Sequence, residues 1–260
     1  NYNTFVKSKR SQVTIFIIVA ILLVVAIVLI FLLYRNSINS FISPGGEEVN
    51  QNIEKCVSKN VEDSINQIIE VGGYIKTPNL IKNFEGREIP YLCYTSKDDE
   101  HCKIVEPVIV EHLKDEIYNN AYNKIDKCFK DQKAELESQG YDIVLGENMD
   151  VSIELLPGKT RVFVQREFKI NKADISKSFS KFTSIIQSPI YDIFIVVHEI
   201  LRQESKYCNS DYPLIMMVNK NVQIDKFQTG DDNKIYDVKD LPTNKNVRFA
   251  VRNCVLTTPK

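Results

Sequence analysis

Residues 151–170 read VSIELLPGKTRVFVQREFKI, and their alternation of apolar and polar residues decides the fold class. Apolar residues recur at alternate positions on both sides of Pro157-Gly158, a pair typical of tight turns. A period of two places such side chains on one face of an extended strand. The stretch therefore predicts a β-hairpin whose apolar face is formed by Val151, Ile153, Leu155, Val162, Val164, Phe168 and Ile170.

The segments before this hairpin have the period of helices. From residue 49 to residue 68, apolar residues recur every three or four positions, and Gly72-Gly73 ends the pattern. A second helix is expected to begin near Pro107, which suits a first helical position, and to run toward Gly140. The inward faces of the two helices are Val49, Ile53, Cys56, Val57, Val61, Ile65 and Ile68, and Val110, Leu113, Ile117, Ala121, Ile125 and Cys128.

Short strands are expected between and after these helices. GYIKTPNL (73–80) and REIPYLCYTSKDDEHCKI (87–104) predict strands and a hairpin. Further strands are expected over the three segments PLIMMVN (213–219), NVQIDKF (221–227) and NVRFAVRNCVL (246–256), with TGDDNK (229–234) as a turn.

A third helix is predicted to start at Ser188-Pro189, with serine as its N-cap and proline at its first position. Its buried side is expected to carry Ile193, Val197, Ile200 and Leu201. Helices interleaved with hairpins predict an α+β fold, in which three main helices pack on mostly antiparallel sheet.

The N-terminal region has a different composition. Residues 13–33 contain no charge, and Thr14 is the only polar residue among them. A bilayer core about 30 Å thick needs about 20 helical residues, whereas the apolar part of a signal peptide is about 7–15 residues long. The alternatives are a cleaved signal peptide and a buried helix of a soluble core. The length favours a single transmembrane helix over residues 13–34.

The flanking charges indicate how this helix would be oriented. Lys7, Lys9 and Arg10 precede it, and positive charge stays on the cytoplasmic side. Residues 1–12 are therefore expected to be a cytoplasmic tail, and residues 35–46 a juxtamembrane hinge. The C-terminal domain is then extracellular, on the cell membrane, and is expected to consist of a helical subdomain with a hairpin (47–140) and an α+β subdomain (141–260).

The six cysteines agree with an exterior location, because an even count outside the cell indicates disulfides. Two cysteines flank a polar hairpin tip, two lie on inward helix faces, and the last two pair by elimination. The expected bridges, each adding about 2–4 kcal/mol, are Cys93–Cys102, Cys56–Cys128 and Cys208–Cys254. Six buried free thiols are the alternative.

The sequence carries no complete catalytic or metal-binding motif. HEILRQ has the first half of a zinc-protease motif, but Arg202 stands where the second histidine is required. The other histidines, His101 and His112, are far from His198 in sequence, and no C-x-x-C occurs. TGDDNKIYD (229–237) offers oxygen ligands for weak Ca²⁺ binding at Asp231, Asp232, Asn233 and Asp237, but an acidic turn is the preferred interpretation. We expect no catalytic, cofactor-binding or metal-binding residue and no cofactor.

Several segments resemble a family. KRSQVTIFIIVAILLVVAIVLIF (9–31) resembles the start of uncharacterised, N-terminally anchored surface proteins of small-genome archaea of the DPANN type, which begin with a GQVTIFII-like membrane helix. The resemblance continues, in order, through KCVSKNVEDSINQIIEVGGYI (55–75), IPYLCY (89–94), GYDIVLG (140–146) and VRFAVRN (247–253). It implies a membrane-anchored, extracytoplasmic protein of an archaeal envelope.

The same N-terminal stretch is also similar to a type IV pilin or class III signal. In such proteins a peptidase cuts before the apolar helix, here at Arg10-Ser11-Gln12, and the helix packs into a filament. Phe16 stands where bacterial pilins often carry glutamate, so a retained anchor is preferred over a processed pilin.

The expected function is a structural, assembly or attachment subunit of an envelope complex or filament. Its partners would be the lipid bilayer and other membrane or surface subunits, identical or different. The chain has a net charge of −1 and no basic stripe, which argues against nucleic acid as a partner. The alternative is a membrane-tethered binding module; an exported enzyme is the third hypothesis, and catalysis is not expected.

Overall fold

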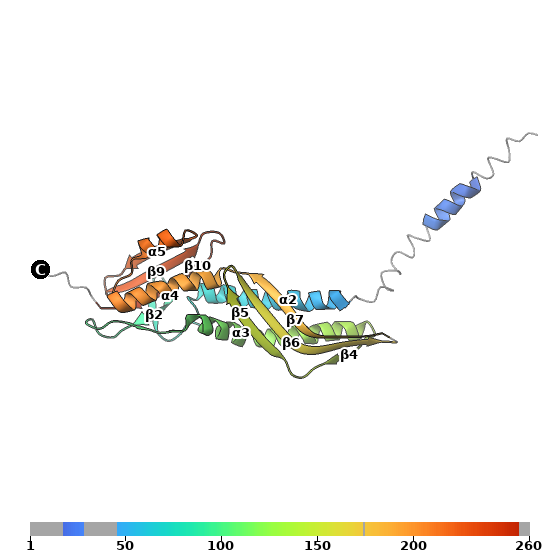
Figure 1. Cartoon of the computed structure of the whole chain (residues 1–260), viewed down its shortest axis with the longest axis horizontal. Coiled ribbons are helices and arrows are strands. Elements are labelled where there is room, and N and C mark those ends of the chain that lie inside the picture. Colours follow the sequence, from blue (N-terminus) through green and yellow to red (C-terminus); the bar gives the residue numbers. More distant parts are fainter. Residues whose placement is uncertain (1–17, 29–45, 174, 255–260) are drawn as a thin grey trace, which may run out of the picture. The chain divides into compact units, whose positions relative to one another are not determined.

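The computed structural model describes residues 18–28, 46–173 and 175–254 (Figure 1). The chain divides into two compact units, Asn1–Glu48 and Val49–Lys260. In the first unit, residues 18–28 form a helix whose apolar side chains are all exposed. Among the described residues, no helix has both the length and the apolar character to span a membrane. The expected tail, most of the hinge and the remainder of the expected span lie outside the described residues.

Two long helices, α2 (Gly46–Glu70) and α3 (Ile109–Ser138), form the frame of the second unit. Cys56 is bonded to Cys128, and Asn120 donates a hydrogen bond to the Ser64 hydroxyl at 2.9 Å. From Cys56 to Ser64 the chain advances along α2, while the partner residues on α3 go back from Cys128 to Asn120 by the same number of positions. The two helices are therefore antiparallel. Their buried residues recur mainly every four positions, which confirms both predicted helices.

The end of α2 follows the expected glycine pattern. The amide of Gly73 donates to the carbonyl of Ile68 at 2.8 Å, the bond that closes a Schellman motif. Gly72 and Gly73 both have positive φ, which only glycine adopts without strain. The predicted strand over residues 73–80 is wrong, because this segment consists of bends and irregular backbone. The first strand, β1 (Ile81–Phe84), begins only after it.

One sheet contains the predicted hairpin, β5 (Asp150–Leu156) and β6 (Lys159–Lys172), which is confirmed. The short strand β4 (Asp142–Leu145) pairs with the second half of β6, and β7 (Ile175–Gln187) pairs along its other edge. α3 packs against β4 and β5. β7 was not predicted from the sequence; its exposed residues include Ser176, Ser178, Ser180 and Lys181.

The second sheet has the order β1-β2-β10-β9-β8, with β3 paired to β2. All pairs are antiparallel except β10 with β2, so the expectation of mostly antiparallel sheet is confirmed. The remaining strands of this sheet are β2 (Arg87–Tyr94), β3 (Lys103–Ile104), β8 (Val222–Gln228), β9 (Asn233–Asp240) and β10 (Asn246–Arg252).

The third main helix, α4 (Ile190–Tyr207), begins one residue after the predicted first position and packs on β9 and β10. The strand predicted over residues 213–219 is wrong, because this segment forms the helix α5 (Tyr212–Val218). Asp211 caps α5 by accepting a hydrogen bond from the Leu214 amide at 3.2 Å, and Pro213 fits its first turn. The cap at Asp211 and the proline in the first turn therefore favour a helix here over the strand that the apolar residues predicted.

All six cysteines are paired, and the three expected bridges are the ones present. Their Cα–Cα distances are 5.9 Å for Cys56–Cys128, 5.4 Å for Cys93–Cys102 and 5.6 Å for Cys208–Cys254, within the ordinary range. One continuous apolar core includes residues from both of the subdomains expected on either side of residue 140. The second unit is thus an α+β body held by three disulfides.

Candidate functional site

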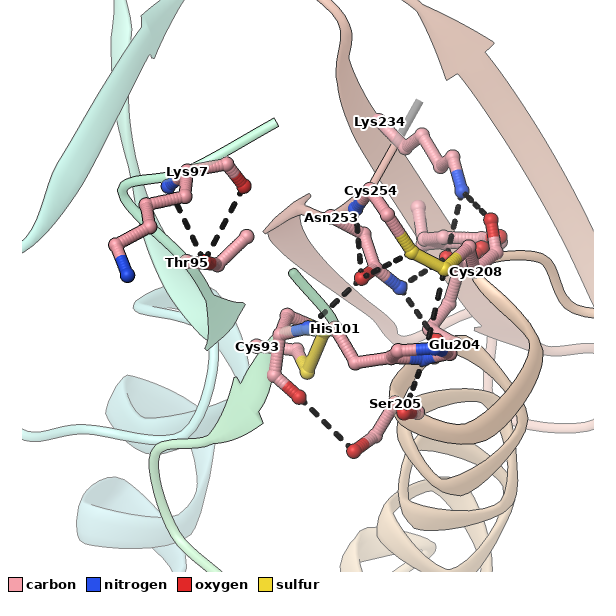
Figure 2. Close-up of a disulfide and its surroundings, with 12 residues drawn as sticks. Cys93, Thr95, Lys97, His101, Glu204, Ser205, Cys208, Lys234, Asn253 and Cys254 are labelled. Atoms are coloured by element: carbon pink, nitrogen blue, oxygen red, sulfur yellow. Dashed lines mark hydrogen bonds and ion pairs between the residues drawn. A yellow bond between two sulfur atoms is a disulfide. The ribbon is translucent and has the colours of Figure 1, made fainter. Parts of the chain in front are cut away.

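Three buried polar side chains meet beside the Cys208–Cys254 disulfide (Figure 2). Glu204 lies in the last turn of α4, Lys234 near the start of β9 and Asn253 directly after β10. Their exposed fractions are 0 % for Glu204, 7 % for Lys234 and 3 % for Asn253. We call these three residues the amide cluster.

Strand register brings the lysine and the asparagine together. In the antiparallel pair of β9 and β10, Lys234 lies opposite Val251. Asn253 follows two residues later, so it has the same sheet face and is a diagonal neighbour of Lys234. This face is the one that α4 covers, because Tyr236 and Phe249, on the same faces of their strands, belong to the core with α4.

The carboxylate of Glu204 is the centre of the cluster's hydrogen bonds. Its Oε2 accepts from Lys234 Nζ at 2.6 Å and from Asn253 Nδ2 at 3.3 Å. Its Oε1 accepts from the Tyr236 hydroxyl. Lys226 Nζ lies 3.8 Å from Oε1. A buried carboxylate with these partners is satisfied without water.

The Asn253 side chain is fixed by its carbonyl as well as by its amide nitrogen. Its Oδ1 accepts from the backbone amides of Cys102 and Cys254, each at 2.8 Å. Its Nδ2 also donates to the backbone carbonyl of Glu204. Figure 2 shows the Asn253 oxygen held on one side and its nitrogen facing Glu204 on the other.

Burial changes the acid–base properties around the cluster. Burial, reinforced by the Glu204 carboxylate, raises the pKa of Tyr236 far above its ordinary value, so this phenol remains a hydrogen-bond donor. Burial lowers the pKa of Lys226; Glu204 opposes this decrease, and Lys234 adds to it. The surroundings therefore disfavour isolated positive charge.

The neighbouring disulfide lies close to a histidine. His101 Nδ1 is 3.5 Å from Cys208 Sγ and 3.1 Å from the Ser205 carbonyl oxygen. His101, Cys208 and Cys254 form the one group of potential metal ligands found in the described part of the chain. Because both sulfurs are in a disulfide, neither is available as the thiolate that metals bind. The other two histidines lie elsewhere, His112 beside Gly73 and His198 within α4.

The oxygen ligands considered for calcium do not converge. Asp231 pairs with Lys82, and Asp237 pairs with Arg248 through bonds of 3.0 and 2.8 Å. Asn233 Oδ1 accepts from the Tyr91 hydroxyl at 2.9 Å. Asp231 and Asp237 are therefore each paired with a different cation, and Asn233 is bonded to a tyrosine.

The amide cluster was not predicted from the sequence, although the sequence contains one signal for it. Glu204 continues the three-to-four residue spacing of Ile193, Val197, Ile200 and Leu201, which places it on the buried face of the third helix. A buried acid requires a partner, and this requirement could have directed attention to the buried lysine.

Comparisons with known proteins found no matching family model, no matching curated protein and no matching solved structure. The function is therefore inferred from the residues of this chain.

Proposed function

We propose that this chain is a single-pass, membrane-anchored cell-surface protein that serves as a structural, assembly or attachment subunit of an archaeal envelope complex or filament. The uncharged stretch over residues 13–33 is the proposed anchor, with the basic N-terminal tail in the cytoplasm. Residues 47–260 are the proposed extracellular body. The archaeal assignment rests on the resemblance of the N-terminal and body segments alone.

The observation that carries this proposal is the pairing of all six cysteines in the body. Disulfides form and persist in oxidising environments and are rare in the cytosol. Two of them join segments far apart in sequence, 72 residues for Cys56–Cys128 and 46 residues for Cys208–Cys254. Such bridges suit a rigid body that works outside the cell.

A surface helix supports contact with other subunits. On α5, Leu214, Met217 and Val218 are exposed by 53, 73 and 76 %. Adjacent exposed apolar side chains are typical of protein–protein contacts rather than of a freely solvated surface. We therefore expect α5 to contribute to a subunit interface.

Protease treatment of intact cells tests the topology. A C-terminally tagged wild type should lose its tag to external protease and resist extraction by alkaline carbonate. A variant in which Lys7, Lys9 and Arg10 are changed to glutamine, with lysines introduced at Asn36 and Asn39, should be inverted and protected. Protection of the wild-type tag, or its recovery in the soluble cytosolic fraction, would contradict the proposal.

Native electrophoresis in mild detergent tests the assembly. Wild type should migrate as an oligomer, and Met217→Lys combined with Val218→Lys should shift it toward the monomer. Val144→Lys is the matched control, since Val144 is an exposed apolar residue on another element. A wild-type monomer would instead favour the alternative, a membrane-tethered binding module.

A hollow on the surface of the body favours the alternative, a membrane-tethered binding module. A hollow beside the start of α4 is lined by charged and polar groups that include Asp192, Lys220 and Asp240. A concave surface with a few polar groups is the usual form of a ligand site. Catalysis on an external substrate is not part of either proposal.

A further inference from the structure

The amide cluster brings an amine, a carboxamide and a carboxylate into one water-excluded space. Lys234 Nζ and Asn253 Nδ2 both donate to the same oxygen, Oε2 of Glu204. The two nitrogens are therefore neighbours, and the carboxylate touches both. A carboxylate in this position can accept a proton from one nitrogen and deliver it to the other.

The carbonyl of Asn253 has the environment of an acyl group prepared for attack. Two backbone amides, from Cys102 and Cys254, donate to its Oδ1 at 2.8 Å. Paired backbone N–H groups at this distance stabilise the negative charge that develops on such an oxygen when a nucleophile adds to the carbon. They also polarise the carbonyl before the reaction.

We propose that Lys234 and Asn253 join in an intramolecular amide bond, formed once, on the folded chain itself. Lys234 passes a proton to Glu204, and the neutral Nζ adds to Cγ of Asn253. Glu204 returns that proton to Nδ2, the Cγ–Nδ2 bond breaks, and ammonia leaves. The proton shed by the new amide nitrogen leaves with the ammonia as ammonium, so atoms and charge balance without any oxidant or reductant.

The fold supplies what this reaction requires. Strand register places the two side chains diagonally on one face of the sheet, within reach of a long lysine side chain. Holding amine and amide together turns a bimolecular reaction into a unimolecular one, which accelerates such reactions by large factors. The new amide N–H can donate to Glu204 in place of the hydrogen bonds that are lost.

The bond would complement the adjacent disulfide. Cys208–Cys254 ties the end of α4 to the segment that follows β10, whereas the proposed bond ties β9 to the same segment. The amide bond resists reduction, so the last strand would remain linked when every disulfide is opened. Such a linkage is useful to a body under external force.

Mass spectrometry of the full chain, purified in mild detergent and fully reduced, tests the proposal. The intact mass should be lower than the mass from the sequence by one ammonia. After trypsin, residues 227–239 should remain joined to residues 253–260, because modified Lys234 is not cleaved. If wild-type protein that was folded before reduction has the complete mass expected from its sequence, the proposal is overturned.

Two lysines on β9 provide a matched pair of variants. Lys234→Arg keeps the charge but has no attacking amine, so it should retain the full sequence mass. Lys239→Arg changes a residue on the opposite face of the same strand and should still lose one ammonia. Loss of ammonia in Lys234→Arg would indicate ring closure of Asn253 on its own backbone and would overturn the proposal.

Glu204→Gln tests the proton transfer. Glutamine keeps the size of the side chain but cannot accept the lysine proton, so the folded variant should keep its ammonia. Folding is checked by the presence of all three disulfides. If this variant forms the joined peptide at the wild-type level, the role assigned to Glu204 is overturned. If the variant does not fold, the mass of the wild type still decides whether the bond forms.

Discussion

Arg166 Nη1 donates to Asp126 Oδ1 at 2.6 Å and links the β6 strand to α3 at a β-bulge. The bulge places two residues of β6, Arg166 among them, opposite one residue of β7. The arginine side chain is 5 % exposed, it donates through Nε to the Gly146 carbonyl at 2.9 Å, and its guanidinium lies 5.3 Å from the centre of the Phe129 ring. A buried charge is thus compensated by one carboxylate, one carbonyl and one aromatic face.

Asp126→Asn should destabilise the body more than Arg166→Met. Asparagine leaves the buried guanidinium without its counter-charge, and removing one partner of a buried pair costs about 3 kcal/mol or more. Methionine instead removes the buried charge and leaves Asp126 with Lys130, 2.6 Å away. Urea unfolding of the two variants provides the comparison. Equal or reversed losses would contradict the view that Asp126 mainly compensates Arg166.

Acid should lower the stability of the body in part through the same carboxylate. Hydrogen bonds, first from Lys130 and then from Arg166, hold the pKa of Asp126 below its ordinary value of 3.8. A depressed folded-state pKa means that the unfolded chain binds protons more readily, so this contribution is present above the ordinary pKa and is lost as the pH falls through the folded one. The free energy of unfolding should therefore decrease as the pH falls from about 5 to about 3.

The variant Asp126→Asn isolates this contribution. It lacks the titrating group, so its free energy of unfolding should fall less between the two pH values than that of the wild type. Identical decreases in both proteins would assign the acid sensitivity to other carboxylates.

The three disulfides should differ in their contribution to stability. Closing a longer loop removes more entropy from the unfolded chain, and the loops span 72 residues for Cys56–Cys128 and 9 residues for Cys93–Cys102. The loop-entropy relation predicts a loss of about 4 kcal/mol for the first pair and about 2.5 kcal/mol for the second. Replacing each pair by alanines and measuring the unfolding midpoint tests the order. A larger loss for Cys93–Cys102 would show that packing, not loop closure, dominates.

The helices and the disulfides could be predicted because their signals are local or periodic. The buried stripe of each long helix repeats in the sequence, and a cysteine on each stripe identifies the pair Cys56–Cys128. The hairpin around Gly158 combines alternation with a turn, so two signals agree. In these elements local preference and tertiary packing agree.

The strands β7 and β9 were missed because their faces do not separate apolar from polar residues. At the bulge, the inward-facing positions of β7 change from even to odd numbers, from the buried Phe182 to the half-buried Phe179, which breaks the period of two. On β9 the buried positions include Asn233, Lys234 and Asp240. The partners of Asn233 and Lys234 come from distant segments, and Asp240 accepts from Thr243 in the turn that follows. The amide cluster was missed for the same reason, since only strand register brings Lys234 near Asn253.

Gly72 lies so close to the second sheet that a side chain there should destabilise the body. A Cβ at Gly72 would lie 2.5 Å from the Arg248 carbonyl oxygen and 2.6 Å from Pro90 Cγ. The first of these is backbone on β10, which cannot move aside without disturbing the β9–β10 pairing. Gly86, in the turn between β1 and β2, also has a positive φ, but a Cβ there would meet nothing within 4 Å.

Gly86→Ala should therefore lose only about 1 kcal/mol, the strain of a left-handed alanine. Gly72→Ala has the same backbone strain plus the clash, so its loss should be about 3 kcal/mol or more. Chemical denaturation of both variants gives the difference directly, and because the backbone strain is common to both, that difference measures the packing of the α2 end against β10. Similar losses in the two variants would mean that the end of α2 can move away from β10 at little cost in free energy. The close contact between them would then contribute little to the stability of the body.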